Sequence, residues 1–117
     1  MLRVDEAELD WDDHDMPSYR GEPFTGEVVE YGPDRQLLSL TSYVDGRLDG
    51  PFRVWTKTGV LVVEGRSRRG DTVGTQREWY PSGTRKVERA YDDSGELRRV
   101  TRWDEEGNVT SDETYEA

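Results

Sequence analysis

The stretch Gly50–Gly70 reads G-P-F-R-V-W-T-K-T-G-V-L-V-V-E-G-R-S-R-R-G and decides how the rest of the chain is read. Two short runs rich in valine, leucine and aromatic residues flank Thr56–Gly59, and a further turn signal closes the stretch at Gly70. Strand-forming residues between glycine turns are typical of a β-hairpin. The stretch therefore predicts two antiparallel strands joined by a short loop.

The same pattern returns along the chain at steps of 24 positions. The clearest marker is an aromatic column at Tyr31, Trp55, Trp79 and Trp103, in which each member lies 24 positions after the one before. Four further sets share that step: Gly26/Gly50/Gly74, Gly59/Gly83/Gly107, Leu37/Leu61/Arg85/Val109 and Tyr19/Tyr43/Ser67/Tyr91/Tyr115. An internal repeat of this length fixes the architecture before anything else. We predict an all-β fold of tandem 24-residue β-hairpin repeats that form one elongated, twisted antiparallel meander sheet.

The predicted hairpin also assigns its side chains to two faces. A three-residue loop sets Trp55 opposite Leu61 and places Val63 on the same face, because side chains alternate along a strand. The other face then carries Phe52 and Val54 with Glu64 and Arg66, and with the acidic column Glu64, Glu88 and Asp112. Arg35 stands where later units have a turn glycine. Since arginine is strained at positive φ, we expect the turn at Pro33 to have another geometry.

Composition alone points away from a folded domain. The chain has 117 residues and a net charge of −10, and its leucine, valine, phenylalanine and isoleucine together number 22. Such a composition is typical of disorder. Against this, eight of the ten tryptophan and tyrosine residues fall in the two aromatic columns, which favours a packed repeat. Charge is also uneven, with 13 acids and 4 bases in residues 1–50, 4 and 9 in residues 51–91, and 9 and 3 in residues 92–117.

Residues 1–20 differ from the rest of the chain. Seven carboxylates occur between Asp5 and Asp15, with Trp11 and His14 among them. Tyr19 already belongs to the tyrosine column, so this segment is either an acidic N-terminal arm or a degenerate cap that docks on the first full hairpin. We predict two regions: the arm or cap at 1–20 and a hairpin-repeat domain of about four units at 21–117.

Catalytic, metal and cofactor chemistry find little support in the sequence. The single histidine, His14, lies in the acidic arm without a nucleophile partner. Asp10–Asp15 lacks the spacing and glycine of a calcium loop, and the glycines sit singly in turns rather than in a phosphate-binding motif. With no cysteine, thiolate sites and disulfides are impossible. We expect no enzyme activity, cofactor or metal. We also expect no nucleic-acid binding, because the net charge repels polyanions, and a cytoplasmic location, because apolar spans are lacking.

The unit G-x-x-x-x-W-x-x-x-G-x-L-x-x-E, followed by an aromatic residue and a glycine turn, resembles the MORN repeat, and more closely its bacterial variant. The resemblance covers about residues 22–115 and departs from the pattern at Arg35, Leu40, Ser67 and Arg85. It implies stacked β-hairpins in one extended sheet. Small proteins with such repeats are similar to an antitoxin or immunity family that neutralises a partner toxin, whereas larger MORN proteins are linked with phospholipid binding and scaffolding. The residues that carry the resemblance are Gly50, Trp55, Gly59, Leu61, Glu64, Gly70, Gly74, Trp79, Tyr80, Gly83, Glu88 and Tyr91.

Tryptophans and arginines of the middle units are the candidate contact residues. The tryptophans are first packing residues and second a partly exposed binding stripe, because a single sheet cannot hide both faces. The arginines form either a solvated face balanced by the glutamate column or a docking patch for an acidic partner surface. We expect a protein-binding module, most specifically one that blocks a toxin by occlusion, with scaffold or anionic-lipid binding as the alternative. The candidate residues are Trp55, Trp79, Trp103, Arg53, Arg66, Arg77, Arg85 and Arg89.

Overall fold

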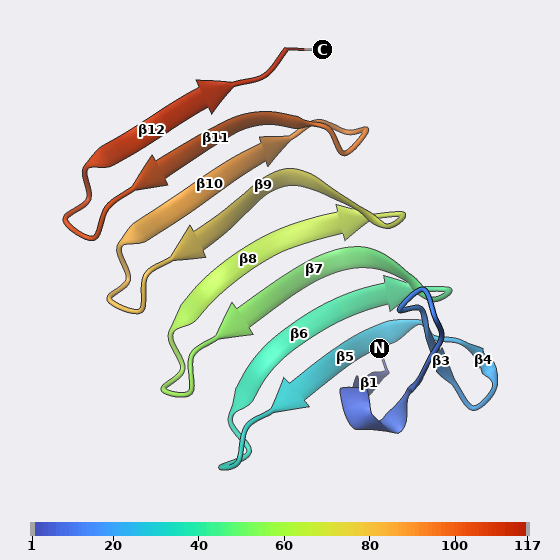
Figure 1. The fold of residues 1–117 in the computed structure, drawn as a ribbon. Coiled ribbons are helices and arrows are strands. Elements are labelled where there is room, and N and C mark those ends of the chain that lie inside the picture. The colour runs from blue at the N-terminus through green and yellow to red at the C-terminus, as the bar shows by residue number, and fades with distance from the viewer. Residues whose placement is uncertain (1, 117) are drawn as a thin grey trace.

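The computed structural model describes residues 2–116 and is built almost entirely of β-strands (Figure 1). The prediction of an all-β protein is confirmed. A single 3-10 turn interrupts the strands near the N-terminus. The elements are β1 Arg3–Asp5, the 3-10 turn η1 Glu6–Glu8, β2 Asp10–Trp11, β3 Pro17–Tyr19, β4 Glu22–Pro23, β5 Gly26–Tyr31, β6 Leu37–Val44, β7 Arg47–Trp55, β8 Leu61–Arg68, β9 Asp71–Trp79, β10 Arg85–Tyr91, β11 Leu97–Trp103 and β12 Val109–Thr114.

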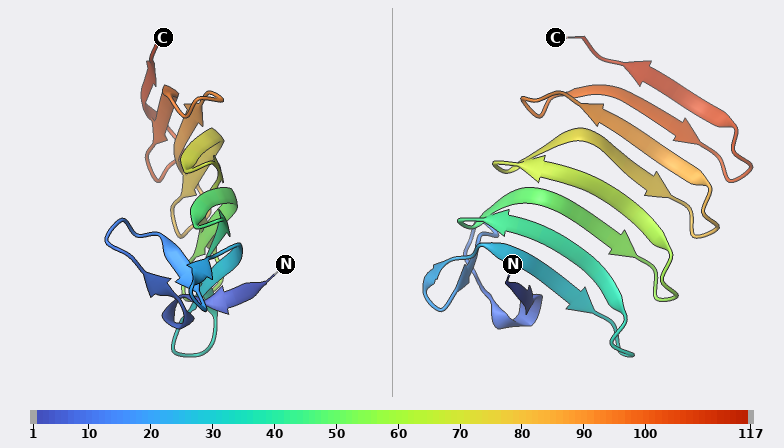
Figure 2. Two further views of the ribbon diagram at one scale, coloured as in Figure 1. Left: turned by 90° about the vertical axis from the view of Figure 1, so that its right-hand side faces the viewer. Right: turned by 180° about the vertical axis from the view of Figure 1, so that it is seen from behind.

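Strands β5 to β12 pair antiparallel in sequence order and form a meander. The prediction of one purely antiparallel sheet is wrong in two respects. First, β1 adds beside β5 in parallel, which makes a mixed nine-stranded sheet. Second, β2, β3 and β4 form a separate three-stranded sheet at the N-terminal end, set to one side of the large sheet in Figure 2. Residues 6–25, which include η1 and the small sheet, form the long connection that a parallel pair of neighbouring strands requires.

Two-residue turns join β6 to β7 and β8 to β9 at one end of the strands, whereas the turn between β10 and β11, Asp92–Glu96, is longer. At Asp45-Gly46 and at Arg69-Gly70 both residues have positive φ, between 50° and 92°. This is the type I′ geometry that matches the twist of paired strands. The turns also stack on their predecessors, since the Gly70 N–H donates to the Leu48 carbonyl at 2.8 Å. Strand β6 ends at Val44 as the Asp45-Gly46 signal predicts.

At the other end of the strands, longer turns share a single hydrogen-bond pattern. The Gly59 N–H donates to the Thr56 carbonyl and the Thr56 N–H to the Val60 carbonyl. Arg35 makes the equivalent bond to Gly32 and adopts φ 60°, close to the left-handed region. The expectation of another geometry at this turn is therefore wrong: neighbouring strands hold Arg35 in the conformation that glycine takes elsewhere.

A bulge in β8 overturns the predicted distribution of side chains between the faces. Trp55 does pair with Leu61, as predicted, but Val54 pairs with Val63, which leaves Val62 as an extra residue. An extra residue moves every following side chain to the other face. Val63 therefore lies on the face of Val54, while Glu64 and Arg66 lie on the face of Trp55.

One cluster of buried apolar side chains lies at the N-terminal end of the sheet, while Val87, Val100 and Trp103 are buried farther along it. Val4 of β1, Leu9 and Phe24 pack on Val28 of β5, and Tyr19 and Tyr43 cover them from the sides. Phe24 makes edge contacts with both tyrosines, at ring-centroid distances of 6.2 and 6.5 Å. Residues 2–24 thus cover one face of β5 and β6. Strands β7 to β12 continue as a single layer (Figure 2).

The described part of the chain contains no helix with the length and apolarity that crossing a membrane requires.

Candidate protein-binding face

A row of charged side chains crosses the middle of the large sheet on the face that residues 2–24 leave open. Cross-strand pairing places Arg53 of β7 opposite Glu64 of β8, Glu64 opposite Arg77 of β9, and Arg77 opposite Glu88 of β10. The row continues through Thr101 to Asp112. Charges of opposite sign that alternate across a ladder stabilise the pairing of strands. We call this set the charge row: Arg53, Glu64, Arg77, Glu88, Thr101 and Asp112.

The three candidate tryptophans lie two residues from the charge row on the same face, on alternate strands. Trp55 pairs with Leu61, Trp79 with Arg85 and Trp103 with Val109. Trp103 is buried, with 8% of its surface exposed, and the Arg85 guanidinium lies 4.5 Å from its ring centroid. Trp55 and Trp79 are half-buried. Trp103 therefore serves packing, whereas Trp55 and Trp79 keep aromatic surface available for contact.

Four of the five candidate arginines share this face and are exposed. Arg53 and Arg77 belong to the charge row, Arg66 lies two residues beyond Glu64, and Arg85 covers Trp103. We call these arginines together with Trp55 and Trp79 the Arg–Trp face.

Arg89 is the exception. It follows Glu88 directly in β10 and so points to the opposite face, where it is half-buried and forms an ion pair with Glu78 of β9. The structure does not bring Arg89 together with the other candidates.

Ion pairs and hydrogen bonds connect neighbouring strands in the C-terminal part of the charge row. Arg99 donates two hydrogen bonds to Asp112, at 2.9 and 2.6 Å, and Thr101 donates a third at 3.2 Å. These bonds, first of all those from Arg99, lower the pKa of Asp112 and raise that of Arg99. Arg77 and Glu88 lie 3.7 Å apart. Sequence reasoning missed Arg99 and Thr101, which strand alternation relative to Trp103 places on this face.

Two shallow hollows run side by side across the Arg–Trp face. One, of about 490 Å³, lies between Arg85, Glu88, Arg99 and Trp103. The other, of about 540 Å³, lies between Asp49, Arg66, Arg77 and Asp93. Both include Thr75, so the surface is continuous across β8 to β12. Open hollows with mixed charge suit the side chains of a protein partner better than a small ligand, which is bound in an enclosed, largely apolar cavity.

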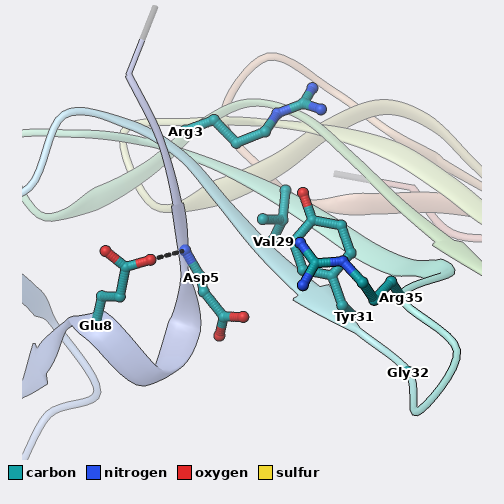
Figure 3. A pocket seen from close by; sticks show the side chains of 7 residues that line it. All are labelled: Arg3, Asp5, Glu8, Val29, Tyr31, Gly32 and Arg35. Atoms are coloured by element: carbon teal, nitrogen blue, oxygen red, sulfur yellow. Dashed lines mark hydrogen bonds between the residues drawn. The ribbon is translucent and has the colours of Figure 1, made fainter.

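A third hollow, of about 480 Å³, lies where β1 and η1 approach the end of β5. Figure 3 shows Asp5 and Glu8 on one side and Tyr31 with the Arg35 guanidinium on the other. The Glu8 carboxylate accepts a hydrogen bond from the Asp5 N–H at 3.3 Å and caps the 3-10 turn. Arg3 pairs with Glu27 at 2.9 Å. The Arg3–Glu27 pair therefore joins β1 to β5, whereas the bond of Glu8 is local to the 3-10 turn.

The acidic arm shows local hydrogen bonding. Asp12 accepts bonds from the backbone N–H groups of Met16 and His14, which lower its pKa. Within residues 2–116 no three histidine or carboxylate groups converge as metal ligands would. Asp12 therefore organises its own turn.

Comparison with known proteins adds no relative: no family model matches the chain, and no match is found among curated proteins or solved structures.

Proposed function

We propose that this chain is a non-enzymatic protein-binding module that makes contact through the Arg–Trp face. The observation that carries the proposal is the register of β7 to β10, which gathers exposed Arg53, Arg66, Arg77 and Arg85 around half-buried Trp55 and Trp79 on an uncovered layer. Arginine and tryptophan are the residue types that most often dominate the energy of protein interfaces.

The architecture that presents this face is proposed to be a tandem array of 24-residue hairpins. Support comes from the bulges: in each of four hairpins the second strand carries one extra residue next to the aromatic pair. These residues, Leu38, Val62, Lys86 and Thr110, are 24 positions apart. Equivalent bulges give equivalent bends, so successive units present their arginines and tryptophans in the same direction.

The specific role proposed is that of an antitoxin or immunity protein, which neutralises a partner toxin by stoichiometric occlusion and without turnover. This rests on the resemblance of Gly50–Gly70 and its repeats to the small MORN-variant antitoxins, and on charge. The strongly acidic ends of the chain favour rapid capture of a basic partner, and the basic centre in residues 51–91 favours contact with acidic residues on it.

The proposal is tested by recovering the partner and locating its contact surface. The tagged protein is purified from the cells that make it at low and at physiological salt, and co-eluting chains are identified by mass. The affinity of the recovered partner is then measured for Trp55→Ala and Arg77→Ala. Arg102→Ala is the matched control, because Arg102 is an exposed arginine of β11 that pairs with Val87 and so lies on the opposite face.

We expect the Trp55 and Arg77 variants to weaken binding about tenfold or more each, as interface hot spots do, and the Arg102 variant to bind normally. Equal effects of all three variants, or recovery of no partner at either salt, would contradict the proposal. Sedimentation with anionic lipid vesicles distinguishes the alternative: binding that needs vesicles and no protein would replace the toxin-neutralising role with a membrane-surface role.

A further inference from the structure

Among residues 2–116, the last strand of the sheet, β12, has a neighbouring strand on one side only. Sheet order ends at β12, which pairs with β11 alone. The Tyr115 N–H donates to the Arg98 carbonyl of β11 at 2.7 Å. Because backbone N–H groups alternate along a strand, those of Glu113 and Ser111 also point to β11. Those of Asp112 and Thr114 therefore point away from the sheet and offer hydrogen bonds to a further strand.

Side chains on this edge define what the next strand should carry. Glu64 of β8 lies between Arg53 and Arg77, one on each neighbouring strand. Asp112 occupies the same row on β12, where Arg99 and Thr101 of β11 bond to its carboxylate and, among residues 2–116, no strand lies on its other side. An arginine on an added strand would give Asp112 a basic neighbour on both sides, as Glu64 has. The pattern favours a basic residue there over a neutral or acidic one.

An apolar position next to the row points the same way. Val109 of β12 pairs with Trp103 and is 58% exposed, whereas Leu61, which pairs with Trp55 in β8, lies between two strands and is half-buried. The strand after β8 carries Trp79 two residues beyond Arg77. An aromatic residue at the same distance from the added arginine would cover Val109.

We propose that β12 is an edge that binds an extended, basic segment of the protein partner as an added antiparallel strand, with an arginine opposite Asp112 and an aromatic residue two positions later over Val109. This inference rests on the proposed protein-binding function and names the chemistry of the segment recognised. Main-chain hydrogen bonds to Asp112 and Thr114 supply binding, and the Arg-x-aromatic pattern supplies selectivity.

A second copy of the chain is a poorer occupant of this edge. Antiparallel pairing of two β12 strands would bring Asp112 and Glu113 of both copies into one six-residue ladder. The adjoining turn adds Asp104, Glu105 and Glu106 from each copy. Like charges so placed oppose pairing, whereas a basic strand is attracted.

The probe is a synthetic peptide, Lys-Thr-Val-Arg-Val-Trp-Thr-Lys, titrated into the whole protein and followed by fluorescence anisotropy. Its control replaces the arginine with glutamate. In the protein, Thr114→Pro removes one outward N–H without removing a bond to β11. An edge strand tolerates proline at such a position, because its N–H faces solvent. Thr114→Ala is the matched control that keeps the N–H. We expect at least tenfold weaker binding for the glutamate peptide and for Thr114→Pro, with Thr114→Ala unchanged.

Amide hydrogen exchange provides a readout that does not depend on the proline variant. Bound peptide should slow exchange at Asp112 and Thr114 and leave Glu113, already bonded to β11, unchanged. The inference would be overturned if the peptide bound Thr114→Pro, or if the glutamate peptide bound the unaltered protein, as tightly as the original pair. It would also be overturned if the peptide slowed amide exchange elsewhere in the sheet, or if the protein formed a dimer that Thr114→Pro dissociates. If the whole partner binds Thr114→Pro normally but loses Trp55→Ala, the edge proposal fails and the proposed function stands. If the whole partner binds Trp55→Ala normally but loses Thr114→Pro, contact through the Arg–Trp face is contradicted and the edge proposal stands.

Discussion

Replacing Gly59 with alanine should destabilise the protein through the backbone alone. Gly59 closes the β7–β8 turn with φ 91°, and a β-carbon built there meets no other atom within 4 Å. No side-chain clash therefore contributes. A left-handed conformation costs an L-residue about 1–2 kcal/mol. The unfolded alanine chain has less entropy to lose, which offsets about 0.4–1 kcal/mol. The expected net loss is about 1 kcal/mol, or about 4 °C in Tm for a domain of this size.

Arg35→Gly is the reciprocal change in the equivalent turn and should have the opposite sign. Glycine relieves the strain of φ 60° at Arg35 but removes the side chain that lines a hollow together with Tyr31. We expect a stabilisation of only about 0.5 kcal/mol, because glycine gains more entropy on unfolding than arginine does, and this offsets part of the relieved strain. Urea unfolding followed by tryptophan fluorescence measures both variants, with an unchanged m-value showing that the denatured state is the same. A neutral Gly59→Ala, or an Arg35→Gly that destabilises by more than about 1 kcal/mol, would refute the view that the two turns share one strained position.

Three further predictions follow from particular contacts. Gly65→Ala should lower the free energy of unfolding in urea by about 1–3 kcal/mol, because a β-carbon at Gly65 would lie 2.9 Å from two ring atoms of Phe52. If the ring causes this loss, adding Phe52→Leu to the same chain should recover part of it. Hydrogen bonds, first of all from Ser94, lower the pKa of Asp92 in the folded protein, so the free energy of unfolding should fall as pH drops below about 4 and the carboxylate is protonated. Asp92→Ala should flatten that part of the pH profile. An unchanged profile would show that Asp92 does not cause the loss of stability in acid. Arg99→Ala should raise the pKa of Asp112 toward that of an ordinary aspartate in an NMR titration, whereas no change would mean that Arg99 does not hold the carboxylate in solution.

Strand positions could be predicted well from the sequence. Strand β7 ends at Trp55 and strand β8 begins at Leu61, on either side of the turn that the pattern of Gly50–Gly70 indicates. These features are local, since glycine, proline and alternating residues act over a few positions. The bulge at Val62 could not be predicted, because an extra residue is visible only in the pairing of two strands. It exchanged the faces of Val63 and Glu64. For the same reason the positive φ of Arg35 was missed: flanking strands impose it.

Most residues of the Arg–Trp face could be predicted from the sequence, but the way strand pairing arranges them could not. Trp55 and Arg53 are two residues apart in one strand, and alternation alone places them together. Arg89 was grouped with them by composition, but it follows Glu88 and so faces the other way, where it pairs with Glu78. The parallel strand β1 has no signal in the repeat, since Arg3–Asp5 is a short segment whose position depends on Val4 reaching Val28 across the chain.

The two ends of the large sheet are stabilised unequally, so the sheet should unfold from one end when it is pulled. At one end β1 lies along the edge of β5 while Leu9 and Phe24 cover its face; at the other end, in the part of the chain that the structure describes, β12 pairs only with β11. In a meander each strand is bonded mainly to its neighbours in sequence, so strands can detach one after another. Tension applied through Tyr115 should peel the sheet strand by strand from β12 inward at low force. The last and highest unfolding barrier should be the separation of Phe24 from the rings of Tyr19 and Tyr43.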